Sequence, residues 1–393
     1  MKILADQNIP LVHEFFSEYG DITCMPGRDI TAAHCREMDV LLVRSITVVD
    51  EALLSGSRVQ FVGSCTIGTD HLDIDYLEAN HILWSNAPGC NANAVVQYVL
   101  SAMAETTEDW QQKNIGIIGY GNIGGRLHKR LTQLGVKNYY YDPFLVAKDH
   151  PNGVDFNTIL QADIITCHTP ITKTGPYPTY HLLGSEQLSR LSDDALLINS
   201  GRGAVIDNQA LLREINRRPS LKVALDVWES EPEINQNLLE KVTLATPHIA
   251  GYSLEGKEQG TFMVYQAFQK ALSSFSSRTI ESTSTPTLYK EKSHLLSNNK
   301  TNLNVSKEWT SLSTQAQLNA LLLACYNIKD DDKRLRTFSS GLEEGGSIAQ
   351  HFDHLRKTYP VRREYSHYRL PDWIEDKSIQ SAFAAISDNS SME

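Results

Sequence analysis

Residues 114–131 have the sequence NIGIIGYGNIGGRLHKRL, with glycines in the spacing Gly119-x-Gly121-x-x-Gly124. The apolar residues 115–118 before them predict a strand, and the residues after them predict a helix. In such a turn, the first glycine makes the tight bend and the second lets the backbone approach a pyrophosphate. The third lets the helix pack on the strand, and the N–H groups at the helix start face the anion. The stretch therefore predicts a dinucleotide-binding turn, with a glycine-rich turn that binds nothing as the alternative.

A carboxylate follows the next predicted strand. The stretch VKNYYYDP, residues 136–143, places Asp142 at the end of that strand, 23 residues after Gly119. This is close to the ~20 residues expected for the acid that accepts hydrogen bonds from the adenosine ribose of NAD. We therefore expect NAD rather than NADP. The cofactor-binding residues predicted here are Gly119, Gly121, Asn122, Ile123, Gly124, Asp142 and, after a later strand, Thr169.

Composition limits the functional classes. The 393 residues carry a net charge of −11 at pH 7, which argues against a nucleic-acid partner. The six cysteines are scattered without a C-x-x-C pair, so we expect neither a disulfide framework nor a metal site. No apolar run reaches ~18 residues and the N-terminus lacks a signal-peptide pattern, so we expect a cytoplasmic protein with no membrane partner.

Short apolar runs alternate with helical patterns over the first 250 residues, which predicts parallel sheets with helices on both faces. Nine strands are many for one such sheet. We therefore expect an α/β protein with two Rossmann-like doubly wound parallel-sheet domains. The predicted strands are Ile3–Ala5, Val40–Val43, Gln60–Val62, Ile115–Ile118, Asn138–Tyr141, Ile164–Cys167, Ala195–Ile198, Val223–Leu225 and Thr243–Ala245.

Two long helical patterns indicate where these domains join. Residues 92–108 lead into the glycine turn, and residues 254–275 return the chain to the first domain. We therefore expect a discontinuous, flavodoxin-like substrate-binding domain of residues 1–95 and 255–283. The NAD-binding Rossmann domain is expected over residues 96–254.

A third, small α+β domain is expected over residues 286–385. The stretch before it is rich in Ser, Thr and Asn, which predicts a linker. The segment YPVRREYSHYRL, residues 359–370, alternates enough to predict a strand. A helical apolar stripe precedes that segment and is expected to be buried in the domain or across a two-fold interface: Leu318, Leu321, Leu322 and Cys325.

Three polar residues follow later strands of the NAD-binding domain: Arg202, Glu231 and His248. Because the carboxyl ends of parallel strands meet at one edge, we expect these side chains to lie in one region. Oxidation of a 2-hydroxy acid needs an arginine for the carboxylate, a histidine as base and a carboxylate behind the histidine. Asp226 is expected to support them or to lie near the nicotinamide. Taken singly, a hydrogen-bonded histidine, a solvated arginine and a turn carboxylate are the ordinary alternatives.

Several stretches resemble the D-isomer-specific 2-hydroxyacid dehydrogenase family. They are MKILADQNIP, LLVRSIT, GSCTIGTDHLD, APGCNANAVVQYV, LDVWESEPEIN, TPHIAGYSLEGKEQGT and, in the tail, LRKTYPVRREYS. By motif and order, Arg202, Glu231 and His248 match the catalytic residues of that family. The resemblance to the family covers about residues 1–280, and the tail extends it toward members that act on a phosphorylated four-carbon sugar acid.

The resemblance implies NAD-dependent oxidation of 4-phospho-D-erythronate, in a step toward pyridoxal phosphate. It also implies a homodimer joined through the C-terminal domain. Substrate contacts are implied for Ser45, Thr66 and Tyr252, and NAD contacts for Gly251 and Asp226.

An acid with a phosphate at its other end needs a second cationic site. Arg44 and Ser45 follow the strand at residues 40–43, and a guanidinium with a hydroxyl donor suits a phosphate. Arg362 and Arg363 in the tail are further candidates on weaker grounds. The alternative makes Arg44 a structural ion-pair partner and Ser45 a turn residue.

Two rival functions remain open. One is a dehydrogenase of the phosphoglycerate type, although no regulatory small-molecule domain is visible in the tail. The other is an NAD-sensing binding protein that keeps the fold without catalysis.

Overall fold

The computed structural model describes residues 1–145, 151–272, 296, 299–340 and 346–388. By its internal contacts the chain forms two compact units, residues 1–91 with 253–299 and residues 92–252 with 300–393. Most of the expected linker lies outside the described residues. Among the described residues, none of the helices combines the length and hydropathy needed to span a bilayer.

The first unit contains a five-stranded parallel sheet in the order β2-β1-β3-β4-β5, which is the flavodoxin-like order. Aromatic side chains of α1 and α11 pack on one face of it. The bounds are β1 Lys2–Asp6, α1 Val12–Phe16, β2 Asp21–Met25, α2 Ala32–Cys35, β3 Val40–Val43, α3 Glu51–Leu54, β4 Phe61–Ser64, α4 Ile74–Ala79, β5 Leu83–Ser85 and α11 Leu254–Leu272.

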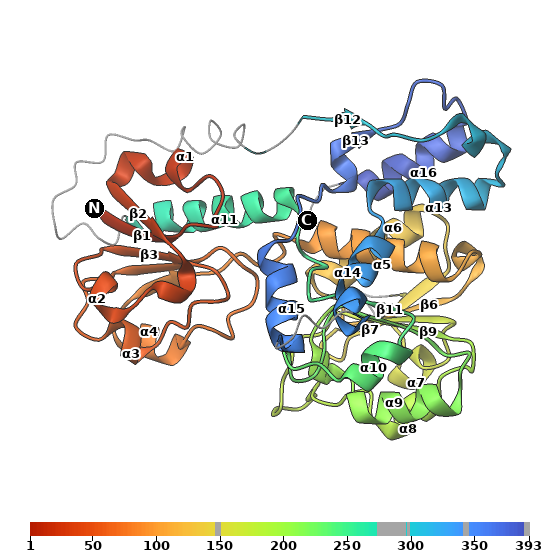
Figure 1. The fold of residues 1–393 in the computed structure, drawn as a ribbon, viewed down its shortest axis with the longest axis horizontal. Coiled ribbons are helices and arrows are strands. Elements are labelled where there is room, and N and C mark those ends of the chain that lie inside the picture. The colour runs from red at the N-terminus through yellow and green to blue at the C-terminus, as the bar shows by residue number, and fades with distance from the viewer. Residues whose placement is uncertain (146–150, 273–295, 297–298, 341–345, 389–393) are drawn as a thin grey trace. The chain divides into compact units, whose positions relative to one another are not determined.

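The second unit contains a six-stranded parallel sheet in the order β11-β10-β9-β8-β6-β7. Helices α5 and α6 lie on one side of this sheet and α8 and α9 on the other (Figure 1). The bounds are α5 Ala92–Thr106, β6 Ile115–Ile118, α6 Asn122–Gln133, β7 Asn138–Tyr141, α7 Phe156–Ile159, β8 Ile164–Cys167, α8 Ser185–Ser189, β9 Leu196–Asn199, α9 Asn208–Arg217, β10 Lys222–Leu225, α10 Gln236–Lys241 and β11 Leu244–Ala245.

All nine predicted strands are present, within one to two residues at each end. In the two large sheets, two further strands, β2 and β5, have no counterpart in the prediction. Both are edge strands of the first sheet, and neither contains a fully buried residue. Their sequences, DITCM and LWS, therefore lack the continuous apolar run by which a buried parallel strand is recognised.

The C-terminal tail packs against the second sheet's own helices. Its stripe of Leu318, Leu321 and Leu322 is buried in the same apolar core as Val99 and Met103 of α5. The expected helix is α13, and a short parallel pair of strands completes the α+β tail. The tail elements are β12 Thr301–Asn302, α13 Thr314–Cys325, α14 Ile328–Ser340, α15 Ile348–Lys357, β13 Tyr368–Arg369 and α16 Lys377–Ser387.

The strand expected over residues 359–370 was largely wrong. Only Tyr368–Arg369 forms a strand, and residues 359–364 have no regular structure. Pro360 lacks an N–H for a strand ladder. The following backbone and side chains bind α5 instead, since the Gln97 amide donates to the Arg363 carbonyl at 3.1 Å.

Candidate active site

The glycine turn follows β6, the strand at which the order of the second sheet reverses, where open α/β sheets bind ligands. Gly119 has φ +92°, a left-handed value that favours glycine. At Gly124, a Cβ atom would come within 1.9 Å of the Gly119 carbonyl oxygen. Gly121, directly before α6, has open space where a Cβ would stand. A side chain is thus disfavoured at Gly119 by its φ and at Gly124 by the close carbonyl oxygen. The backbone at Gly121 is open, as the approach of a pyrophosphate would require.

Two side chains beside this turn fit the rest of a dinucleotide. One Asp142 carboxylate oxygen accepts a hydrogen bond from the Tyr120 N–H at 3.0 Å, and the other accepts from Phe144 at 3.1 Å. Asp142 is therefore fixed against the glycine turn. The Thr169 hydroxyl is buried without a hydrogen-bond partner, and its methyl lies 3.0 Å from where a Cβ of Gly119 would stand. An unsatisfied buried hydroxyl next to the turn suits a bound polar ligand.

Asp226, at the end of β10, shapes the turn that carries His248. Its carboxylate accepts hydrogen bonds from the Thr246 hydroxyl at 2.6 Å and from the N–H groups of Ile249 and Ala250 at 2.8 and 2.9 Å. Burial raises the pKa of Asp226, and the neighbouring His248 and these hydrogen bonds oppose that rise. The structure thus supplies a supporting role for Asp226, while its contact with NAD stays a prediction.

His248 and Glu231 form a hydrogen-bonded pair at the carboxyl edge of the sheet. The distance from His248 Nδ1 to Glu231 Oε2 is 2.7 Å, and the Trp228 N–H holds the other carboxylate oxygen at 2.7 Å. Burial alone would raise the pKa of Glu231, but His248 and the two hydrogen bonds bring it below its usual range. Glu231 therefore remains ionised, and it fixes the His248 tautomer with Nε2 available for a proton.

His248 and the residue before Glu231 have strained backbone. His248 has φ +57° and Ser230, beside Glu231, has φ +67°. Non-glycine residues rarely adopt such values, and they concentrate where a side chain must be aimed. The Trp228 indole N–H also donates to the Thr246 carbonyl at 3.0 Å, which joins the two loops.

Arg202 follows β9, the strand next to β10. The Asn199 amide donates to the Arg202 carbonyl at 3.0 Å and fixes the start of its loop. At Gly203, a Cβ would lie 2.0 Å from the Trp228 backbone, so the Arg202 loop rests directly on the Glu231 loop. The loops of the three predicted catalytic residues are therefore adjacent.

The tail supports the segment that follows His248. The Arg362 guanidinium donates to the Ala250 carbonyl and lies 4.4 Å from the Tyr326 ring centroid. Arg362 is only 6% exposed, so it anchors the segment next to Gly251 and Tyr252 and is not available to a substrate phosphate. Its candidacy as a phosphate ligand is therefore not supported.

The predicted substrate residues of the first unit follow β3 and β4, which are neighbours in that sheet. Ser45 is exposed, and the Thr66 hydroxyl lies 2.9 Å from that of Ser64. Arg44 is half-buried, and within the described part of the chain it forms no ion pair. The alternative in which Arg44 is a structural ion-pair partner therefore loses its main support. That Arg44 binds a phosphate stays a prediction.

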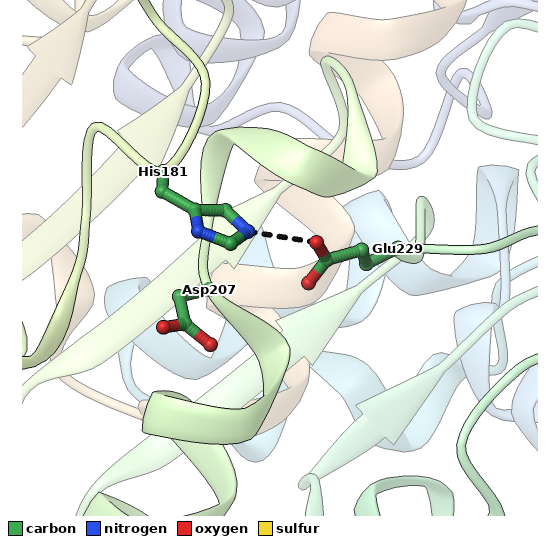
Figure 2. Close-up of side chains that lie close together, drawn as sticks. All are labelled: His181, Asp207 and Glu229. Atoms are coloured by element: carbon green, nitrogen blue, oxygen red, sulfur yellow. Dashed lines mark hydrogen bonds and ion pairs between the residues drawn. The ribbon is translucent and has the colours of Figure 1, made fainter.

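A second histidine–carboxylate pair lies on the Glu231 loop. His181 Nε2 is 2.7 Å from Glu229, and the Asp207 carboxylate lies beside them (Figure 2). Asp207 caps α9 by accepting from the Ala210 N–H, and Glu229 also accepts from Asn208. These are the only side chains of the described regions grouped closely enough to share a metal ion. The hydrogen bonds that His181, Asp207 and Glu229 already form explain why these side chains lie together. They join the loops that carry them, and we call this group the structural clasp.

Sequence reasoning missed one residue near the site, Arg356 of α15. Its guanidinium lies 5.9 Å from the Tyr252 ring centroid. In the sequence it is one of several cations at the end of a helix, and no spacing rule connects it with residues a hundred positions earlier.

Comparison with known proteins identifies the family of the chain. Residues 92–250 match the model of the D-isomer specific 2-hydroxyacid dehydrogenase, NAD binding domain, and residues 299–385 match a domain of unknown function. The chain is 46% identical over 371 residues to an erythronate-4-phosphate dehydrogenase of Cellvibrio japonicus, covering 94% of each chain. It is 44% identical over 374 residues to one of Saccharophagus degradans, again covering 94% of each.

Among solved structures, the NAD-bound 3-phosphoglycerate dehydrogenase of Entamoeba histolytica has the same fold. Its TM-score is 0.61 at 22% identity, over 71% of this chain and 97% of that one. The dehydrogenases above cover more of this chain, 94% against 71%. The chain therefore belongs to the erythronate-4-phosphate dehydrogenase family, within the D-isomer specific 2-hydroxyacid dehydrogenases.

Proposed function

We propose that this protein oxidises the 2-hydroxyl of 4-phospho-D-erythronate, giving (R)-3-hydroxy-2-oxo-4-phosphobutanoate, in the synthesis of pyridoxal phosphate. The observation that carries the chemistry is the 2.7 Å pair of His248 and Glu231 at the sheet edge that also carries the glycine turn. The names of the relatives supply the substrate.

The residues divide the reaction between them. Arg202 holds the substrate carboxylate through its guanidinium, and His248 Nε2 takes the proton of the 2-hydroxyl. Glu231 stabilises the imidazolium that results, because an ionised carboxylate lies against the other ring nitrogen. NAD, when bound, accepts the hydride that leaves the same carbon. In the reverse direction His248 returns the proton as a general acid.

The cofactor is held by the glycine turn and its neighbours. Gly119, Gly121 and Gly124 give the pyrophosphate its place before α6, and Asp142 accepts hydrogen bonds from the ribose. Thr169 and Gly251 are proposed to line the nicotinamide side. The substrate contacts proposed from the family resemblance are Arg44, Ser45, Thr66 and Tyr252.

Replacing Asp142 with alanine is expected to narrow the preference for NAD over NADP by at least ~10-fold, because the repulsion of a ribose phosphate disappears. The ratio of kcat/KM for the two cofactors measures this. Asp142→Asn is the matched variant, since it keeps an oxygen for the Tyr120 N–H and loses only the charge. A ratio unchanged in both variants would show that Asp142 does not face the ribose.

The assembly and location follow the family pattern. We propose a homodimer whose C-terminal domain forms the interface, acting in the cytoplasm. The rival phosphoglycerate dehydrogenase is supported only by a likeness of fold at 22% identity. A non-catalytic NAD sensor would have no need of a carboxylate fixed behind His248.

A substrate panel tests the proposal. The purified protein with NAD is given 4-phospho-D-erythronate, D-erythronate, 3-phosphoglycerate and D-lactate, and NADH formation is followed by absorbance. We expect kcat/KM to be highest for 4-phospho-D-erythronate. Equal turnover of the phosphorylated and unphosphorylated acids would contradict the substrate, and no turnover of any of the four would contradict the activity.

A further inference from the structure

The tail helix α15 directs one cation toward the active-site loops. Ile348 and Phe352, at helical spacing, are buried in the core beneath the second sheet. Arg356 comes four residues after Phe352 and therefore continues the same inward face. The helix is fixed at its start by Ser347, which accepts a hydrogen bond from the Gln350 N–H. The position of Arg356 is thus determined by packing over the length of the helix.

The neighbours of Arg356 are active-site residues. Its guanidinium lies 5.9 Å from the Tyr252 ring centroid, and Tyr252 in turn packs edge-on against Tyr359 of the tail at 5.6 Å. Burial acts to lower the pKa of Arg356, but Tyr252 and the more distant Glu231 raise it overall. The guanidinium therefore remains charged, beside a residue of the proposed substrate site and within electrostatic range of the His248–Glu231 pair.

This charge is incompletely satisfied by the protein. The Nε atom of Arg356 is buried without a hydrogen-bond partner. Tyr252 hydrogen-bonds to the guanidinium, and the charges of Glu231 and Asp353 act on it, but among the described residues no ion pair to Arg356 is seen. A half-buried guanidinium with one buried, unpartnered N–H can still bind an anionic ligand.

A cation at a helix end also has a structural explanation, because it interacts favourably with the helix dipole. Lys357, in the same last turn, is exposed and serves that purpose without approaching the site. Arg362 also has unpartnered nitrogens, but it is enclosed against Tyr326 and bound to the Ala250 carbonyl. Arg356 alone among these three is both directed toward the site and only half-buried.

We infer that Arg356 binds the phosphate of the substrate, so that the C-terminal domain supplies a specificity-determining residue to the active site. The inference rests on the proposed function, in which Arg202 already binds the carboxylate at the other end of the acid. A guanidinium forms two parallel hydrogen bonds with a phosphate, which suits a dianion in a protein of net charge −11. By this inference, the domain of unknown function that matches residues 299–385 helps to select the substrate.

Calorimetric titration of the NADH-loaded protein tests this without turnover, because a hydroxy acid cannot be oxidised by NADH. Wild type, Arg356→Ala, Arg356→Lys and Lys357→Ala are titrated with 4-phospho-D-erythronate and with D-erythronate. We expect Arg356→Ala to bind the phosphorylated acid about 10- to 100-fold more weakly. Its affinity for D-erythronate should stay within about 2-fold, since loss of a phosphate contact leaves the rest of the acid unaffected. Arg356→Lys should recover part of the loss, and Lys357→Ala should match wild type.

The outcomes separate this inference from the proposed function. If Arg356→Ala weakens both acids equally, or neither, the inference is wrong even where the wild type oxidises 4-phospho-D-erythronate. If the wild type binds that acid selectively through Arg356 but does not oxidise it with NAD, the inference stands and the proposed reaction fails. Thermal unfolding of each variant shows whether α15 remains packed, and a variant that has lost its transition is replaced by Arg356→Gln, which keeps most of the side chain.

Discussion

His248→Ala is expected to lower kcat by about 10²–10⁴-fold, the usual contribution of a general base, while the affinity for NAD changes by less than about 2-fold. The imidazole is the group proposed to take the hydroxyl proton, whereas the glycine turn and Asp142, which are proposed to hold the cofactor, lie on other loops. Steady-state kinetics with saturating acid gives kcat. Fluorescence titration with NADH gives the cofactor affinity.

The chain offers a matched control for that variant. His181 forms an equally short bond, 2.7 Å, with Glu229 on the same loop, but its partners belong to the structural clasp of Figure 2. His181→Ala also removes a histidine from a carboxylate and tests the effect of loosening that loop. We expect its kcat to fall by less than about 10-fold. Equal losses in the two variants would mean that His248 acts by holding the loop and not as the base.

Glu231→Gln is expected to move the acidic limb of the pH–rate profile for oxidation to lower pH. The pKa of Glu231 lies below its usual range, so the carboxylate stays ionised beside the imidazole. Removing that negative charge destabilises the imidazolium, and the neutral base then persists at lower pH. kcat/KM measured over pH shows the shift. An unchanged limb would contradict the coupling that the 2.7 Å contact indicates.

The sequence predicted the two parallel sheets because buried parallel strands are continuous apolar runs. Ile115–Ile118, Leu196–Asn199 and Val40–Val43 are buried throughout and were recognised for that reason. The edge strand Asp21–Met25 is partly exposed and carries no such signal. The irregular segment after Tyr359 was mistaken for a strand because its alternation arises from contacts with α5, which only the packed chain reveals.

The candidate site, like the fold, could be predicted only in part from the sequence. Arg202, Glu231 and His248 could be proposed from sequence because each follows a strand, and parallel strands end at one edge. What could not be predicted is the support behind them. A supporting role was among the expectations for Asp226, but the three hydrogen bonds by which it holds the His248 turn were not predicted. Nor was the bond from Arg362 to the Ala250 carbonyl, more than a hundred residues away. The Arg362 contact depends on how the tail packs, for which no local sequence rule exists.

Deleting residues 300–393 is expected to leave a protein that is insoluble or that unfolds at a much lower temperature. The tail's Leu318, Leu321 and Leu322 are in the same buried core as α5. Burying one such side chain contributes about 1.5–3 kcal/mol, and a whole domain is stable by only about 5–15 kcal/mol. Losing the entire tail side of that core therefore removes stability comparable with the total. Yield of soluble protein, thermal unfolding and sedimentation measure the outcome.

Leu321→Ala tests the same core without removing Arg356 or Arg362. Leu321 is fully buried, so its truncation should lower the free energy of unfolding by about 2–5 kcal/mol while kcat well below the melting temperature stays near wild type. The deletion variant, if any of it stays soluble, should also lose activity because the Ala250 segment loses its anchor. A deletion variant that remained soluble, dimeric and as stable as wild type would contradict both the shared core and the tail's proposed part in the dimer. Since α13 and the α5 face are buried against each other within one chain, we expect any two-fold interface to use tail surfaces other than this leucine stripe.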